Sequence, residues 1–207
     1  MNSSARQRAI SRAKARSMKQ NGLKSLPPLG LIEMGRLGEL AMRIVAANLQ
    51  AVIGMSVDIL DPLTVPPESF QKHREQYDAG LIIEHLRQLP LPGHPRVLAV
   101  TTVDLCTPIL THVFGQAEVG GRAAVVSNFR LRSNEDGSTV PLDRYYERLA
   151  KVSLHETAHT LSVYHCEDVQ CLMHFTAKVE HLDRLEIAFC RRCQFMLREN
   201  LKYLTIK

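Results

Sequence analysis

The sequence SLHETAHTLSVYHCEDVQCLM, from Ser153 to Met173, brings three histidines, two glutamates and two cysteines into one short segment. Within it, His155-Glu156-Thr157-Ala158-His159 matches the pattern HExxH. Positions i and i+4 of a helix lie on the same face, so His155 and His159 can reach one metal ion from adjacent turns. The segment therefore predicts a zinc site carried by a helix.

The residues before this motif have the apolar spacing of a helix. Apolar residues recur at intervals of three and four, at Leu142, Tyr145, Tyr146, Leu149, Val152 and Ala158. This spacing predicts one long helix over residues 142–162, with the two histidines in its last turns.

Glu156 follows the first histidine directly and can reach a water molecule coordinated to a zinc ion there. Zinc lowers the pKa of such a water from about 16 toward about 7, and a carboxylate can take its proton as the water attacks a carbonyl. We therefore expect Glu156 to be the general base of a hydrolytic site.

The sequence offers more than one candidate for the third zinc ligand. His165 lies six residues past His159, and three imidazoles leave the fourth coordination position open for water and substrate, as in catalytic sites. A downstream glutamate, Glu180 or Glu186, is the alternative. The shorter spacing favours His165.

Four of the five cysteines fall late in the chain, as two close pairs: Cys166, Cys171, Cys190 and Cys193. Two pairs separated by a spacer are a common way to build a tetrahedral zinc site from four thiolates, and such a site is closed and structural. The alternative is four buried cysteines without a metal. The N-terminus lacks the apolar core of a secretory signal, so disulfides are not expected.

Composition bounds the class of protein. The chain has 207 residues, of which 45% are apolar and 23% charged, as in an ordinary soluble domain. It has no apolar run long enough to cross a membrane. We expect a cytoplasmic monomer with one domain over residues 25–207.

The formal net charge of +5 belongs to the N-terminus. Residues 1–24 hold seven of the 26 basic side chains and no acid, which leaves a net charge of −2 for the rest of the chain. No aromatic residue interleaves these charges, as a nucleic-acid stacking platform would require. We therefore expect a flexible basic tail and do not expect nucleic acid as a partner.

The remaining pattern alternates strands and helices. Strands are expected over residues 29–33, 51–60, 96–103 and 122–131. Helices are expected over residues 36–50, 79–88 and 191–204, the second with Asp78 as its N-cap. The alternation predicts an α/β sheet on which the long 142–162 helix packs.

The combined pattern HExxHxxSxxHCx4CxM-x16-CxxC, from His155 to Cys193, closely resembles that of the archaemetzincin family of metalloproteases. The sequence departs from the family pattern in two ways. Ser162 stands where the family has glycine, and the last spacer is one residue shorter.

The resemblance implies a compact metzincin-like zincin fold of the α/β (α+β) type. Its parts are a twisted mixed sheet, an active-site helix that ends near Ser162, a methionine turn at Met173 and a C-terminal helix. The segment 122–131 is expected to be a strand that lines the active site and pairs with an extended peptide.

The resemblance also assigns roles. His155, His159 and His165 would hold a catalytic zinc ion and Glu156 would be the general base. A structural zinc ion would bind four cysteines: Cys166, Cys171, Cys190 and Cys193. The implied activity is hydrolysis of peptide or protein substrates, with a preference for short peptides and aminopeptidase action among the options. The alternative is a weakly active or inactive, zinc-stabilised binding protein that carries a basic arm.

Overall fold

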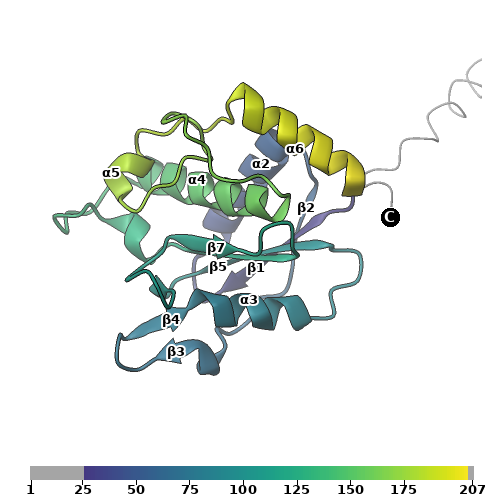
Figure 1. Ribbon diagram of the computed structural model, residues 1–207. Coiled ribbons are helices and arrows are strands. Elements are labelled where there is room, and N and C mark those ends of the chain that lie inside the picture. Colours follow the sequence, from purple (N-terminus) through teal and green to yellow (C-terminus); the bar gives the residue numbers. More distant parts are fainter. Residues whose placement is uncertain (1–25, 205–207) are drawn as a thin grey trace, which may run out of the picture.

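A five-stranded mixed sheet forms the centre of the computed structural model, which describes residues 26–204 (Figure 1). In spatial order its strands are β2 (Val57–Ile59), β1 (Leu29–Met34), β5 (Arg96–Thr101), β8 (Ala123–Ser127) and β7 (Gly115–Ala117). The first four run parallel, and β7 is antiparallel to β8. The expected twisted mixed sheet is confirmed.

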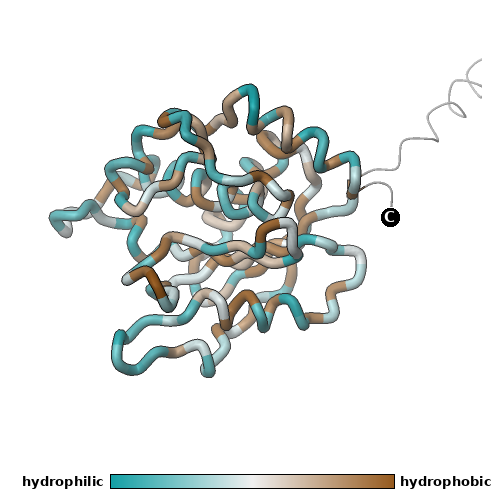
Figure 2. The backbone as a smooth tube through the Cα atoms, in the orientation of Figure 1, coloured by the Kyte–Doolittle hydropathy of each residue, from teal (hydrophilic) through white to brown (hydrophobic). Residues whose placement is uncertain are grey.

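The sheet separates two apolar cores. Alternate residues of β5 and β8 point to opposite faces, because side chains alternate along a strand. Helix α3 (Ala79–Gln88) covers one face. Helices α2 (Glu39–Ile53), α4 (Leu142–Thr160) and α6 (Arg191–Leu204) pack into the core on the other face (Figure 1). Apolar residues run through the central strands, as parallel strands buried on both faces require (Figure 2).

Three predicted helices are confirmed, two of them with their boundaries. Helix α3 begins after Asp78, whose side chain accepts hydrogen bonds from the N–H groups of Gly80 (2.8 Å) and Leu81 (3.3 Å). Helix α6 occupies the predicted residues 191–204. Helix α4 covers most of the predicted 142–162 segment and ends at Thr160.

The predicted strand over residues 51–60 is wrong in its first half. Helix α2 continues to Ile53, whose buried side chain extends the apolar face that includes Leu49. Gly54 then adopts the left-handed conformation (φ 85°) and ends the helix. Only Val57–Ile59 forms strand β2.

The smaller elements were not anticipated. A second, three-stranded sheet consists of β3 (Phe70–Gln71), β4 (Gln76–Asp78) and β6 (Leu105–Cys106). Short helical turns lie at η1 (Pro67–Ser69), η2 (Phe129–Arg132) and α5 (Val179–Leu182). The predicted basic tail lies outside the described residues. Among those described, no helix is both long and apolar enough to span a membrane.

Helix α4 carries two buried cations that connect it to the last residue of α5 and the residue after it. Arg148 donates to both carboxylate oxygens of Asp183, at 2.7 Å each. Lys151 donates to the carbonyls of Leu182 (3.2 Å) and Asp183 (3.4 Å). These contacts hold the segment around Asp183 against the helix that bears the histidines.

Candidate active site

Three histidines converge at the C-terminal end of α4. His155 and His159 project from adjacent turns, and their Nε2 atoms lie 3.0 Å apart. His165 returns from beyond the helix and places its Nε2 3.2 Å from that of His159. Ligands about 2.0 Å from a tetrahedral zinc ion would lie roughly 3.3 Å from one another, so the spacing suits zinc.

The hydrogen bonds of the rings leave their Nε2 atoms free to coordinate. Nδ1 of His155 lies 2.8 Å from the carbonyl of Leu172, and Nδ1 of His159 lies 2.8 Å from the carbonyl of Val163. Because a carbonyl only accepts, each Nδ1 carries the proton and each neutral ring keeps its lone pair on Nε2. Nε2 atoms this close together could hold one metal ion between them.

Burial keeps these imidazoles neutral. It lowers the pKa of His155 to about 3, with a further contribution from His159, and lowers the pKa of His159 to about 4. Burial also lowers the pKa of His165. Neutral rings are the form that binds a metal ion.

The turn that returns the chain to His165 is formed at Ser162. The N–H groups of Leu161 and Val163 both donate to the carbonyl of Ala158, which closes the helix. Ser162 has φ 60°, in the left-handed region that favours glycine. The expected turn is therefore present, with serine in a conformation that costs on the order of 1 kcal/mol.

Glu156 is buried, and burial raises its pKa to about 8. Its side chain lies against the backbone of Gly115 on β7, where a Cβ atom would lie 2.6 Å from Glu156 Cγ. The base expected from the HExxH motif therefore lies directly beside the edge of the sheet. Gly115 was not singled out from the sequence, because only the fold brings it to Glu156.

The prediction that residues 122–131 supply the cleft strand is wrong. Strand β8 forms only over Ala123–Ser127, and the short helix η2 follows it. It pairs with β5 on one side and β7 on the other, so neither of its edges is free. The free edge is β7, residues 115–117. With three residues, one of them glycine, β7 shows no alternating pattern in the sequence.

The hydrogen-bond register shows which groups β7 offers to the cleft. Ser127 N–H donates to the carbonyl of Phe114 (2.8 Å), and Glu118 N–H donates to the carbonyl of Ala123 (2.9 Å). Hydrogen-bonded pairs alternate in an antiparallel ladder, so the backbone groups of Gly115 and Ala117 point away from β8. They are available to a bound chain.

Met173 is buried in the main core, at the position predicted for the methionine turn. The N–H of Cys166 donates to its carbonyl at 2.9 Å, and the N–H of His174 donates to the carbonyl of Cys171 at 2.8 Å. Leu172, between them, accepts the hydrogen bond of His155. The turn therefore holds the ring of His155 and the backbone of Cys166, which directly follows His165.

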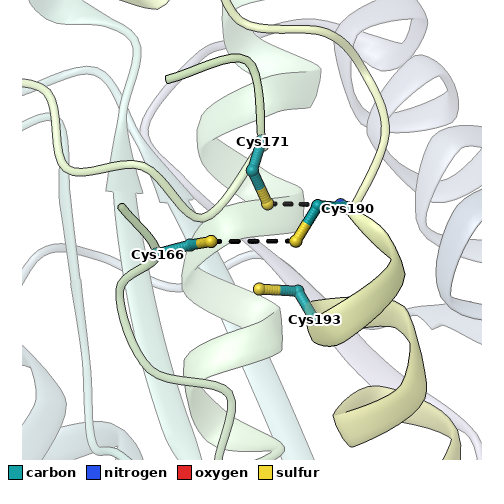
Figure 3. A group of neighbouring side chains, drawn as sticks. All are labelled: Cys166, Cys171, Cys190 and Cys193. Atoms are coloured by element: carbon teal, nitrogen blue, oxygen red, sulfur yellow. Dashed lines mark hydrogen bonds between the residues drawn. The ribbon is translucent and has the colours of Figure 1, made fainter. Parts of the chain in front are cut away.

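The four late cysteines gather where the loop after His165 meets the start of α6 (Figure 3). All four sulfur atoms lie within 4.8 Å of one another, and the Sγ atoms of Cys166 and Cys190 are 3.7 Å apart. Thiolates about 2.3 Å from a tetrahedral zinc ion would lie roughly 3.8 Å apart. None of these four cysteines forms a disulfide bond in the described part of the chain.

The surroundings of this cluster favour a bound cation. Sγ of Cys171 accepts N–H groups from Cys190 (3.3 Å) and Met173 (3.5 Å). Burial and then the neighbouring sulfurs raise the pKa of Cys193. Four thiols packed this closely cannot all ionise unless a metal ion compensates their charge.

A cavity of about 590 Å³ opens beside the three histidines and Glu156. The segments 107–117 and 175–177 line it together with α4. Lys151 on α4 also lines it and is 1% exposed. Its position could have been inferred from the sequence, because Lys151 lies four residues before His155 and therefore one turn away on the same face of the helix.

Comparison with known proteins gives a consistent result. The model of the family described as peptidase family M54 matches residues 66–199. The archaemetzincin of Methanopyrus kandleri is 39% identical over 138 residues, which cover 67% of this chain and 75% of that protein.

Solved structures agree with the sequence comparison. The crystal structure of archaemetzincin from Methanopyrus kandleri matches with a TM-score of 0.73 and 32% identity, covering 85% of this chain and 97% of that one. A zinc-dependent peptidase from Methanocorpusculum labreanum matches with a TM-score of 0.73 and 28% identity, covering 82% and 99%.

Proposed function

The chain belongs to peptidase family M54 and is a metallopeptidase of the archaemetzincin type, and from that premise we propose how its residues hydrolyse a peptide bond. His155, His159 and His165 hold a catalytic zinc ion, and Glu156 is the general base. The observation that carries the proposal is the convergence of the Nε2 atoms of three histidines, 3.0 and 3.2 Å apart, close to this buried carboxylate.

Zinc, when bound, supplies Lewis-acid chemistry: it polarises the scissile carbonyl and lowers the pKa of a coordinated water from about 16 to about 7. Glu156 accepts the proton of the attacking water. It then returns a proton to the nitrogen of the departing amine, because the same carboxyl group can act as base and then as acid. Gly115 leaves the space that this side chain occupies.

The substrate lies in an extended conformation along β7. The outward backbone groups of Gly115 and Ala117 pair with it by strand addition, which supplies affinity without regard to side chains. The cavity beside Glu156 then accepts the side chain that follows the scissile bond. Short peptides suit this cleft, and the proposal includes aminopeptidase action on them.

A second zinc ion binds Cys166, Cys171, Cys190 and Cys193 in a closed, structural site. It joins the loop after His165 to α6 and so fixes the residue next to the third histidine. Residues 25–207 act as one catalytic domain in this proposal.

The alternative of an inactive binding protein rested on Ser162 and on the basic arm. Ser162 adopts the left-handed conformation that the turn needs, and His165 lies 3.2 Å from His159. The basic arm lies outside the described residues. No geometry in the described part of the chain favours this alternative.

A peptide library tests the proposed activity. Zinc-loaded wild type and His159→Ala are incubated with a mixed library, and new termini are identified by mass spectrometry. The proposal expects cleavage by the wild type alone, together with loss of one zinc ion per chain from His159→Ala. Cleavage that persists unchanged in His159→Ala would contradict it.

A further inference from the structure

One wall of the cavity beside Glu156 carries a charge that the hydrolytic mechanism does not use. Lys151 lines this cavity from α4, and its side chain is only 1% exposed. Every residue with a charged side chain costs free energy when buried, so a leucine or methionine would be the cheaper way to fill this wall. The position calls for an explanation beyond packing.

The ammonium group of Lys151 has three protein partners, and the shortest contact, 2.5 Å, is the ion pair with Glu147. Its two backbone contacts, to the carbonyls of Leu182 and Asp183, measure 3.2 and 3.4 Å, which is longer than the usual 2.9–3.0 Å. Its ionic partner is Glu147, one turn earlier on the same helix. Glu147 is 39% exposed, so its carboxylate can turn toward water when another anion binds Lys151.

The charges around the cavity favour a carboxylate as that anion. Among the described residues that line it, Lys151 is the only lysine or arginine, and Glu156 is the only acid. The neighbouring Arg148 does not compete, because Asp183 occupies it with two hydrogen bonds. Most of the other lining residues are apolar.

The distance along the helix matches a single substrate residue. Lys151 precedes His155 by one turn, which is about 6 Å along the helix axis. A residue whose backbone lies at the catalytic histidines can therefore place a carboxylate at Lys151 across the apolar part of the cavity.

We propose that Lys151 gives this peptidase a preference for substrates with a carboxylate on the residue that follows the scissile bond. This inference rests on the proposed function and names its substrate class. The carboxylate has two sources: the side chain of an aspartate or glutamate, or the C-terminus of a peptide cleaved at its last bond. Lys151 pairs with either one by a charge-assisted hydrogen bond.

Matched peptides separate the two sources. In the first arm, quenched fluorescent peptides differ only in glutamate or glutamine after the scissile bond, inside an amidated sequence. In the second arm, that residue is a C-terminal glutamine with either a free carboxylate or an amide. Wild type, Lys151→Met and the exposed control Lys72→Met are compared by kcat/KM in both arms.

The proposal expects wild type and Lys72→Met to favour the carboxylate in at least one arm by about tenfold or more, as one charge-assisted hydrogen bond allows. Lys151→Met should remove that preference. It should still fold, because the Glu147 left behind is 39% exposed. Glu147→Gln gives an independent check: it removes the competing anion and should strengthen the preference. Equal rates in both arms, or a preference that survives in Lys151→Met, would overturn the proposal.

A binding measurement keeps this test separate from the test of catalysis. The same peptides are titrated by calorimetry into zinc-loaded Glu156→Gln and into the double variant that also carries Lys151→Met. Tighter binding of the carboxylate peptides that is lost in the double variant supports the role of Lys151, even if no peptide is cleaved. Cleavage failure with this binding pattern would count against the proposed function alone. Equal affinities for the matched peptides would count against Lys151.

Discussion

The side chain of Glu156 lies against the backbone of Gly115, so closely that a Cβ atom on residue 115 would lie 2.6 Å from Glu156 Cγ. The same atom would lie 2.9 Å from the carbonyl oxygen of Val125 on β8. The glutamate of the HExxH motif therefore packs directly against the edge strand of the cleft. A methyl group at residue 115 cannot be added unless one of them moves.

Gly115→Ala should consequently lose activity while keeping its zinc. We expect kcat to fall roughly tenfold to a hundredfold, because a displacement of about 1 Å at a catalytic group can cost that much. Zinc content by mass spectrometry should not change, since the three histidines are untouched. Gly80→Ala in the first turn of α3 is the matched control and should leave activity unchanged. Full activity in Gly115→Ala would show that Glu156 is not fixed by this contact.

Ser162 allows a second prediction, on the turn that aims His165. Ser162→Gly should have activity equal to or above wild type. Its stability should change by less than about 1 kcal/mol, because the relief of strain offsets the greater freedom of the unfolded chain. Ser162→Val should lose zinc affinity, since a β-branched residue is strongly disfavoured at φ 60°. The measurement is zinc affinity by competition with a chelator. A glycine variant that binds zinc more weakly than wild type would contradict this account of the turn.

The buried pair of Arg148 and Asp183 predicts a pH dependence of stability. Burial alone would raise the pKa of Asp183, but hydrogen bonds and charge from Arg148, with a smaller contribution from Arg144, hold it below its usual value. A lowered pKa in the folded state means that the ionised carboxylate stabilises the fold above the unfolded pKa of about 3.9. That stabilisation is lost as the pH falls through the lower, folded value.

Asp183→Asn should therefore destabilise the protein by about 3–5 kcal/mol at pH 7, because it leaves Arg148 buried without its counter-charge. The difference in the free energy of unfolding between wild type and Asp183→Asn should stay constant down to about pH 5 and become smaller below about pH 4. Urea unfolding at several pH values measures it. Glu39→Gln, from an exposed pair with Arg43, is the control and should change stability by less than about 1 kcal/mol. A difference in the free energy of unfolding that grows as the pH falls would contradict this account of the Arg148–Asp183 pair.

Zinc removal should separate the two metal sites. Two zinc ions per chain are expected, and a mild chelator should remove the histidine-bound ion first, because that site keeps an open coordination position while four thiolates close the other. Cys193→Ser should lose the second zinc ion. It should also weaken the attachment of α6 to the loop after His165. Zinc counting during dialysis checks the order. Simultaneous loss of both ions, or a folded protein with no zinc at the cysteines, would contradict the assignment.

The parts of the site that were predictable from sequence are those fixed by local geometry. His155 and His159 converge because residues four apart share a helical face, and Asp78 caps α3 because its side chain reaches N–H groups two and three residues ahead. None of these inferences needs a contact between distant segments.

Most of the parts that escaped prediction depend on tertiary contacts. Strand β7 has three residues and exists because β8 pairs with it, so its sequence carries no pattern of its own. Lys151 is buried in contact with a segment more than thirty residues away, where the carbonyls of Leu182 and Asp183 accept its hydrogen bonds. From sequence alone a lysine on a helix is expected to face solvent. The error over residues 51–60 has a different, local origin, because a short apolar run at the end of a helix resembles one in a strand.

The central claim is that Glu156 is the general base at a zinc site formed by His155, His159 and His165. The most direct test is the turnover of zinc-loaded Glu156→Gln against wild type on one peptide, with zinc content measured on the same samples. The account predicts equal zinc content and a loss of about a hundredfold to ten-thousandfold in kcat, because glutamine matches the shape of glutamate but cannot accept a proton. Equal turnover by the two proteins at equal zinc content would contradict it.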